Sequence, residues 1–202
     1  MTERTILIFS LVFFMLFPTT ALGDINPWAE SYRLEALSQY ETATKSIDAV
    51  IERKPQHEFA YLRRGWLNYL AGKHNTSIRD YQKAMDLSPK SLEARLGIML
   101  PLIAQQRWRE VNSHANKVLE VAPWNYYAHV RLMIAEEGER KWDTLLKHAT
   151  AVNQRYPSDA TVLLYLARAN AWQNNDKAAR NAYQQVLERS PSHIEALQYL
   201  SQ

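Results

Sequence analysis

The chain has 202 residues, of which 47% are hydrophobic and 22% charged, and its formal net charge is +3. This composition is typical of a soluble globular protein rather than a disordered one, and the small, evenly spread positive charge argues against nucleic-acid binding. The sequence has no cysteine, which excludes disulfides, thiolate metal sites and catalytic thiols.

The first 23 residues predict a secretory signal peptide. Arg4 lies in a short polar start and is followed by an apolar stretch from Ile6 to Phe17. This stretch is shorter than the roughly 20 residues that a membrane-spanning helix needs. Small residues at Ala21 and Gly23 fit a cleavage site, so we expect cleavage after Gly23 and a periplasmic or secreted protein. The alternative is an uncleaved segment that anchors the chain in a membrane.

In the remaining chain, residues 24–202, five of the seven prolines recur at a fixed interval. They are spaced 34 residues apart, at Pro55, Pro89, Pro123, Pro157 and Pro191. Proline lacks a backbone N–H and disfavours a helical residue before it, so each one ends a helix at the same point of a unit. A fixed period of this length indicates a repeat array.

Each unit is predicted to contain two helices. In the second helices, apolar or small residues recur at spacings of four and three, in columns that begin at Ala43, Ile47 and Val50. These spacings place the three columns on one helical face. The first helices carry a column of their own: Ser31, Gly65, Met99, Met133 and Ala167.

The final segment, 192–202, is predicted to form one more first-type helix. We expect it to cap the open end of the array, with its apolar side chains turned inward: Ile194, Leu197 and Leu200.

The second unit gives the sharpest pattern, a fixed order of large, small, aromatic and proline positions: Tyr61, Gly65, Ser77, Tyr81, Ala84 and Pro89. In this pattern the chain resembles the tetratricopeptide repeat (TPR) family over residues 24–202. The resemblance implies an all-α fold, a right-handed α-solenoid of about five helix-turn-helix units plus a C-terminal capping helix. It also implies that the first helices line a concave groove that binds a protein or peptide.

The resemblance places these groove residues on the first helices: Trp28, Tyr32, Phe59, Leu62, Arg63, Trp66, Tyr69, Leu100, Tyr127, Arg131, Ile134, Tyr165, Arg168 and Trp172. Aromatic residues and arginine carry much of the binding energy at protein interfaces. The alternative is that these side chains only fill a tightly wound superhelix. Trp108 and Trp142 lie at the turn into the second helix, and we interpret them as packing residues.

Some TPR domains hold a peptide's C-terminal carboxylate with lysine and asparagine side chains on successive first helices. The corresponding positions here are Leu62, Trp66, Gly97, Tyr127 and Arg131. Only Arg131 has a suitable charge, so we expect no such clamp and favour an apolar or amphipathic ligand segment.

No catalytic motif is present in the sequence, so we expect no enzyme activity and no cofactor. His114 and His148 occupy equivalent places on neighbouring second helices, too far apart for a shared metal ion. The charged run from Glu136 to Lys141 is interpreted as a solvated turn.

These features predict an exported, non-catalytic scaffold for a protein or peptide partner from an envelope assembly or secretion machine. We expect no nucleic acid and no metal among its ligands, and contact with a membrane only through an uncleaved signal segment. The alternative is a carbohydrate-binding module of an exopolysaccharide system, in which tryptophans stack on sugar rings: Trp28, Trp66 and Trp172.

Overall fold

The structure is a computed structural model that describes residues 26–202; the predicted signal segment and its cleavage site lie outside these residues. The described part is all α-helical, with eleven helices and no strand among residues 26–202. The five helical hairpins are α1 (Pro27–Ala36) with α2 (Tyr40–Arg53), α3 (Glu58–Leu70) with α4 (His74–Leu87), α5 (Leu92–Ala104) with α6 (Trp108–Val121), α7 (Tyr126–Gly138) with α8 (Trp142–Arg155), and α9 (Ala160–Trp172) with α10 (Asp176–Arg189). The last helix is α11 (Ile194–Leu200).

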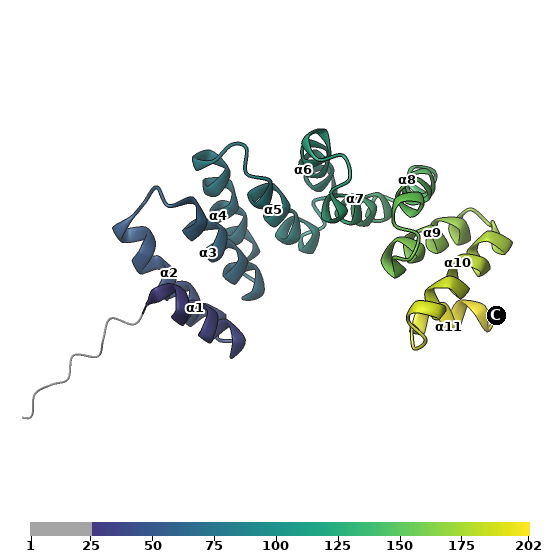
Figure 1. The fold of residues 1–202 in the computed structure, drawn as a ribbon, viewed down its shortest axis with the longest axis horizontal. Helices are drawn as coiled ribbons and strands as arrows, with labels where there is room; N and C mark the ends of the chain where they lie inside the picture. Colours follow the sequence, from purple (N-terminus) through teal and green to yellow (C-terminus); the bar gives the residue numbers. More distant parts are fainter. Residues whose placement is uncertain (1–25) are drawn as a thin grey trace, which may run out of the picture.

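The hairpins stack side by side into an arch (Figure 1). In the middle of the arch α6 and α8 lie on the convex side, whereas α7 and α9 lie beneath them on the concave side. Neighbouring first helices contact each other, α3 with α5, α5 with α7 and α7 with α9. The expected all-α solenoid of helical hairpins is therefore confirmed, and its first helices form the inner wall.

Each turn from a first to a second helix uses one residue in the left-handed region of backbone conformation. These residues recur every 34 positions, at Ser38, Gly72, Gln106, Arg140 and Asn174, with φ between 56° and 72°. The following N–H then bonds to a carbonyl five residues back, as from Lys73 to Asn68 (2.8 Å). This pattern ends a helix and reverses the chain, and only Gly72 makes it without steric cost.

The carbonyl group of the periodic proline is satisfied by a side chain of the next first helix. Tyr61 donates to Pro55 (3.1 Å), and Arg95 donates to Pro89 (2.9 Å). In the fourth unit Nε2 of His129 lies 2.9 Å from the Pro123 carbonyl oxygen. Three different residue types at one position of the repeat therefore fix the same junction between units.

The predicted columns form a continuous core along the array. The inner faces of the second helices are buried from Ala43 to Val186, and the clusters of α1–α3, α3–α7, α7–α9 and α9–α11 follow one another without a gap. Trp108 and Trp142 pack against these clusters, as expected. Trp108 lies where a Cβ at Gly138 would be 2.5 Å from its ring, so glycine makes room for the indole.

The capping prediction was wrong for two of its three side chains. In α11, Leu200 packs on the core, but Ile194 is 70% exposed and Leu197 is 47% exposed. Leu163, at the position of α9 equivalent to Leu197, is buried because α10 covers it. No second helix follows α11 in the described chain, so the same face stays open.

Among residues 26–202 the structure contains no helix with the length and apolar character that crossing a membrane requires.

Candidate functional site: the inner surface of the arch

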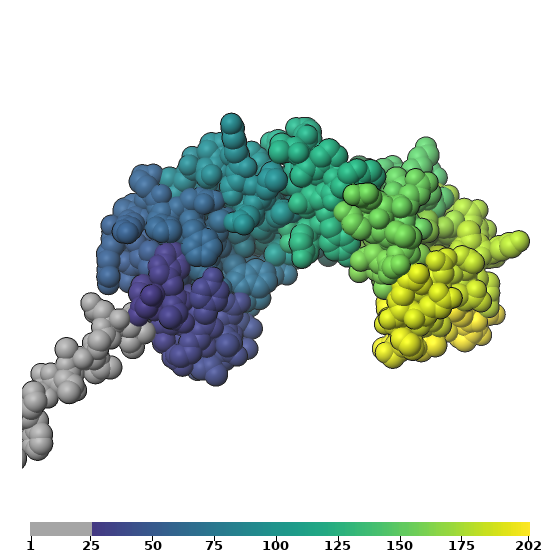
Figure 2. All heavy atoms as spheres, viewed as in Figure 1, coloured from purple at the N-terminus to yellow at the C-terminus, as the bar shows by residue number. Residues whose placement is uncertain are grey.

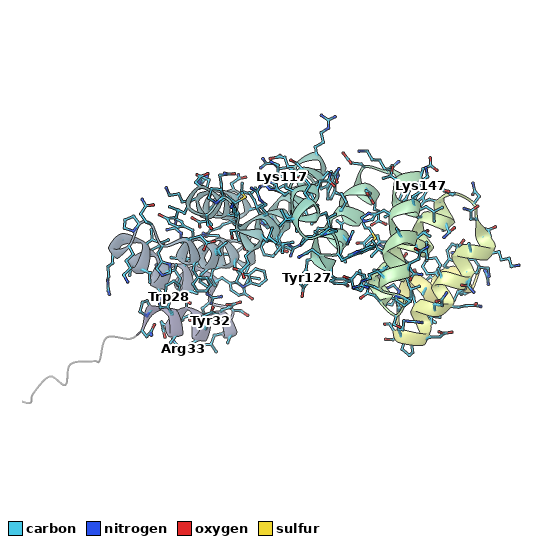
Figure 3. All side chains as sticks on the ribbon, turned by 45° about the horizontal axis from the view of Figure 1, so that its top comes forward. Trp28, Tyr32, Arg33, Lys117, Tyr127 and Lys147 are labelled. Atoms are coloured by element: carbon cyan, nitrogen blue, oxygen red, sulfur yellow. The ribbon has the colours of Figure 1, made fainter. Side chains whose placement is uncertain are left out.

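The arch encloses a hollow between its two ends, which Figure 2 shows from one side. The structure divides the predicted groove residues into three classes by exposure. Leu62, Arg63 and Tyr165 are buried; Trp28, Trp66, Tyr69, Leu100, Arg131, Ile134 and Arg168 are half-buried. The exposed ones are Tyr32 (51%), Phe59 (43%), Tyr127 (61%) and Trp172 (61%). In Figure 3 Tyr127 points into the hollow, whereas Lys117 and Lys147 lie on the opposite, convex side.

A first cluster joins α1 and α3, and we call it the N-terminal cluster: Tyr32, Glu35, Arg63 and Trp66. The buried Arg63 forms an ion pair with Glu35, and its guanidinium lies 3.8 Å from the centre of the Tyr32 ring. The indole N–H of Trp66 donates to the same carboxylate (2.7 Å). Glu35 therefore fixes both the arginine and the tryptophan, while the outer face of Tyr32 stays open.

Arg131 lies in the middle of the inner surface, on α7. Its guanidinium donates to the Leu96 carbonyl of α5 and lies 5.8 Å from the centre of the Tyr127 ring. Burial lowers the pKa of Arg131, and none of the ion pairs among residues 26–202 includes it. A guanidinium without an ion pair can donate hydrogen bonds to a carbonyl or carboxylate group of an incoming peptide.

A cavity of about 400 Å³ lies at the other end, between α7, α9, α10 and α11, and we call it the C-terminal pocket. Arg168 lies in it between Glu137 and Glu195, and the exposed Trp172 lines its edge. Trp172 stacks on Trp142, with ring centres 4.8 Å apart and planes 9° from parallel. This contact holds an aromatic surface in a fixed position beside two carboxylates.

Sequence reasoning missed the carboxylates that fix these arginines, Glu35, Glu137 and Glu195. A signal was available for all three. Glu35 and Glu137 lie in register with Tyr69, and Glu195 lies in register with Tyr127; both tyrosines were assigned to the groove. The interpretation of the run 136–141 as a solvated turn was also wrong for its first residues. Helix α7 continues to Gly138, so Glu136 is buried and Glu137 half-buried.

The side chain of His148 contacts His129 and Glu136 of α7 rather than His114. Its Nε2 lies 2.9 Å from Nδ1 of His129, and its Nδ1 lies 2.9 Å from Oε2 of Glu136. This chain of polar groups ties α7 to α8 within the fourth unit. No group of histidine, aspartate and glutamate side chains suited to a metal ion occurs in the described part of the chain.

The three tryptophans that could stack on sugar rings differ in how much of their surface is exposed. Trp28 packs on His57 and Phe59, at 5.3 and 5.2 Å between ring centres, and is half-buried. Trp66 is half-buried and its N–H is bonded to Glu35. Only Trp172 of the three exposes more than half of its surface.

A tetratricopeptide repeat family model matches residues 59–91 and 161–193, the second and fifth hairpins. This match assigns the second and fifth hairpins to the family. These two hairpins are tetratricopeptide repeats. The other three hairpins have the same two-helix arrangement. A comparison with curated protein sequences gave no match.

Solved TPR structures have the same fold. MamA from Desulfovibrio magneticus RS-1 is 15% identical with a TM-score of 0.75, over 83% of this chain and 95% of that one. YrrB, described as a TPR protein with an unusual peptide-binding site, is 16% identical with a TM-score of 0.71, over 88% and 92%. A thermophilic TPR protein of Thermus thermophilus is 16% identical with a TM-score of 0.65, over 87% and 96%. At these identities the likeness establishes the shared fold.

Proposed function

We propose that this TPR protein is an exported, non-catalytic scaffold that binds a segment of a protein partner on its inner surface. The partner would belong to an envelope assembly or secretion machine, and the bound segment would be apolar or amphipathic. TPR proteins are interaction scaffolds in general, and a peptide-binding site is ascribed to YrrB. The predicted signal peptide in residues 1–23 supports export.

The observation that carries the proposal is a set of exposed aromatic side chains on the inner wall: Tyr32, Tyr127 and Trp172. Each lies beside an arginine or a second aromatic ring that fixes it. Side chains held in this way lose little conformational entropy when a ligand covers them, and aromatic burial contributes strongly to binding. Burial of apolar surface contributes roughly 25 cal/mol per Å².

The proposal is tested by placing a photo-crosslinking amino acid at Tyr127 and, as the matched control, at Lys147 on the convex side. The crosslinker is activated in the cells that produce the protein, and the crosslinked segment is identified by mass spectrometry. We expect one dominant partner segment from an envelope protein at position 127 and none at position 147. Equal crosslinking at both positions, or a cytoplasmic partner, would contradict the proposal.

Export is tested separately by cell fractionation and by sequencing the N-terminus of the mature protein. We expect an N-terminus at Asp24 in the periplasmic or secreted fraction. A protein that keeps Met1 and stays with the cytoplasmic fraction would contradict export but not peptide binding.

A further inference from the structure

The two carboxylates of the C-terminal pocket are unequally satisfied. Glu195 accepts two bonds from Arg168, Nε to Oε1 (2.8 Å) and Nη2 to Oε2 (2.5 Å), and a third from the Tyr183 hydroxyl (2.8 Å). Among the described residues, the only hydrogen bonds that Glu137 accepts come from Nη1 of Arg168, at 3.3 and 3.2 Å. Because a bidentate pair is stronger than two long contacts shared by one nitrogen, the guanidinium binds mainly to Glu195.

One negative charge therefore remains uncompensated in the pocket, and it lies on Glu137. Burial raises the pKa of Glu137, which is the expected effect when a carboxylate leaves water without gaining enough donors. Arg168 and Glu195 pull the pKa of Glu137 in opposite directions, and neither removes the effect of burial. A second cation beside Glu137 would supply the missing counter-charge.

The aromatic edge of the pocket suits the same kind of ligand. The indole of Trp172 is 61% exposed, and one of its two faces is covered by Trp142. The other face is free to attract a cation, and tryptophan is the best of the aromatic rings for this interaction. Tyr199 of α11 also lines the cavity, whose volume of about 400 Å³ accommodates a long side chain.

From these contacts we propose that the C-terminal pocket binds a lysine or arginine side chain of the partner segment, between the Glu137 carboxylate and the Trp172 indole. The inference rests on the proposed function and adds the chemistry of one ligand residue. The surplus negative charge favours a cationic group over a neutral sugar, which would also stack on Trp172 but would leave Glu137 without a counter-charge.

The pocket is tested with small probes rather than with the partner. Nα-acetyl-lysine amide is titrated into the mature chain, residues 24–202, at millimolar concentrations while the indole N–H resonances are followed by NMR. Nα-acetyl-norleucine amide, which lacks the charge, and a neutral trisaccharide serve as matched ligands. We expect the Trp172 resonance to shift with the lysine probe and to shift little with the other two.

The Glu137→Gln variant removes the surplus charge but keeps the shape, and it should bind the lysine probe about fivefold more weakly. Glu93→Gln, on the exposed surface of α5, is the control and should bind like the parent protein. Equal shifts with the norleucine probe, or an unchanged affinity of Glu137→Gln, would overturn the inference. Tighter binding of the trisaccharide would replace it with the carbohydrate alternative.

The two proposals fail separately. If the pocket does not bind the lysine probe but the protein still crosslinks a partner at Tyr127, only the proposal of a basic ligand side chain is contradicted. A pocket that binds the lysine probe in a protein without a crosslinked partner would instead contradict the scaffold proposal and leave the pocket standing.

Discussion

The second and fourth units fill the same place between their two helices in opposite ways. In the second unit, Gly65 on α3 faces Tyr81 on α4, whose ring lies 3.2 Å from the position a Cβ of Gly65 would take. In the fourth unit the equivalent residues are Met133 and Ala149, and both are fully buried. A large residue on one helix is thus matched by a small one on the other, which fills the same volume with different shapes.

The difference also decides what the inner wall presents. The Tyr81 ring extends so far that a Cβ at Gly97 on α5 would lie 2.2 Å from it. At the equivalent positions α3 and α7 carry Arg63 and Arg131, which organise the inner surface around Tyr32 and Tyr127. Because the Tyr81 ring needs this space, the third unit carries Gly97 at the position where the second and fourth units carry an arginine on the inner wall.

The largest effect is expected when the methionine of the fourth unit is shortened. Met133→Ala leaves a cavity that the small Ala149 cannot fill, so we expect a loss of about 3 to 4 kcal/mol in the free energy of unfolding. Urea denaturation followed by circular dichroism measures the change. Val121→Ala, at a side chain that is 72% exposed, is the control and should change the stability by less than about 0.5 kcal/mol. A loss below about 1 kcal/mol for Met133→Ala would mean that the site collapses around the cavity.

The second unit is tested by adding an atom rather than removing atoms. Gly97→Ala places a methyl group against the buried Tyr81 ring, so we expect a loss of about 2 to 3 kcal/mol in the free energy of unfolding. In a Tyr81→Ala background the clash is absent, and the same substitution should stabilise the protein by about 1 kcal/mol, because alanine forms helices better than glycine. The four proteins form a double-mutant cycle. A penalty of the same size in both backgrounds would show that Tyr81 is not its cause.

The arrangement of hairpins was predictable because its determinants are local. A proline at a fixed interval and apolar columns at helical spacing act within one unit, so both can be recognised along the sequence. The pairing of Gly65 with Tyr81 was not recognised, although both columns were, because pairing depends on how two helices face each other. The same limit applies to Ile194 and Leu197, whose exposure depends on whether a second helix covers them.

The inner surface was only partly predictable from the sequence. The register identified Arg63 and Arg168, but burial and ion pairing depend on carboxylates that lie elsewhere in the chain. Glu137 belongs to a run of charged residues at the end of a helix, which looks like a solvated loop when read along the chain. Only the structure shows that α7 continues through this run and turns Glu137 toward Arg168.

The two units should also differ in their response to acid. Tyr61 and His129 hold equivalent proline carbonyls, but only histidine titrates near neutral pH. Burial lowers the pKa of His129, so as the pH falls the unfolded chain takes up this proton before the folded one does. The contribution of His129 to stability is complete above its unfolded pKa, near 6.5, and is lost as the pH falls below that value. Burial lowers the pKa of His114 as well, and this acts in the same direction.

The His129→Tyr variant gives the fourth unit the residue of the second. Its free energy of unfolding should depend less steeply on pH between 7 and 5, by at most about 1.4 kcal/mol per pH unit, the slope for one proton. Urea unfolding at several pH values measures the slope, and the contribution of His114 remains in both proteins. Parallel pH profiles for the parent and the variant would show that His129 does not titrate differently in the two states.

The smallest effect concerns the turns between the two helices. Gly72 and Arg140 both adopt left-handed conformations, with φ of 72° and 56°. For a residue with a Cβ this conformation costs about 1 to 2 kcal/mol, and the greater entropy of glycine in the unfolded chain offsets roughly half of that difference. We therefore expect Arg140→Gly to raise the free energy of unfolding by about 0.5 to 1 kcal/mol. Gly72→Ala should lower it by a similar amount. Thermal and urea unfolding of both variants measure the pair, and changes of the same sign would show that the two turns are not governed by the same backbone strain.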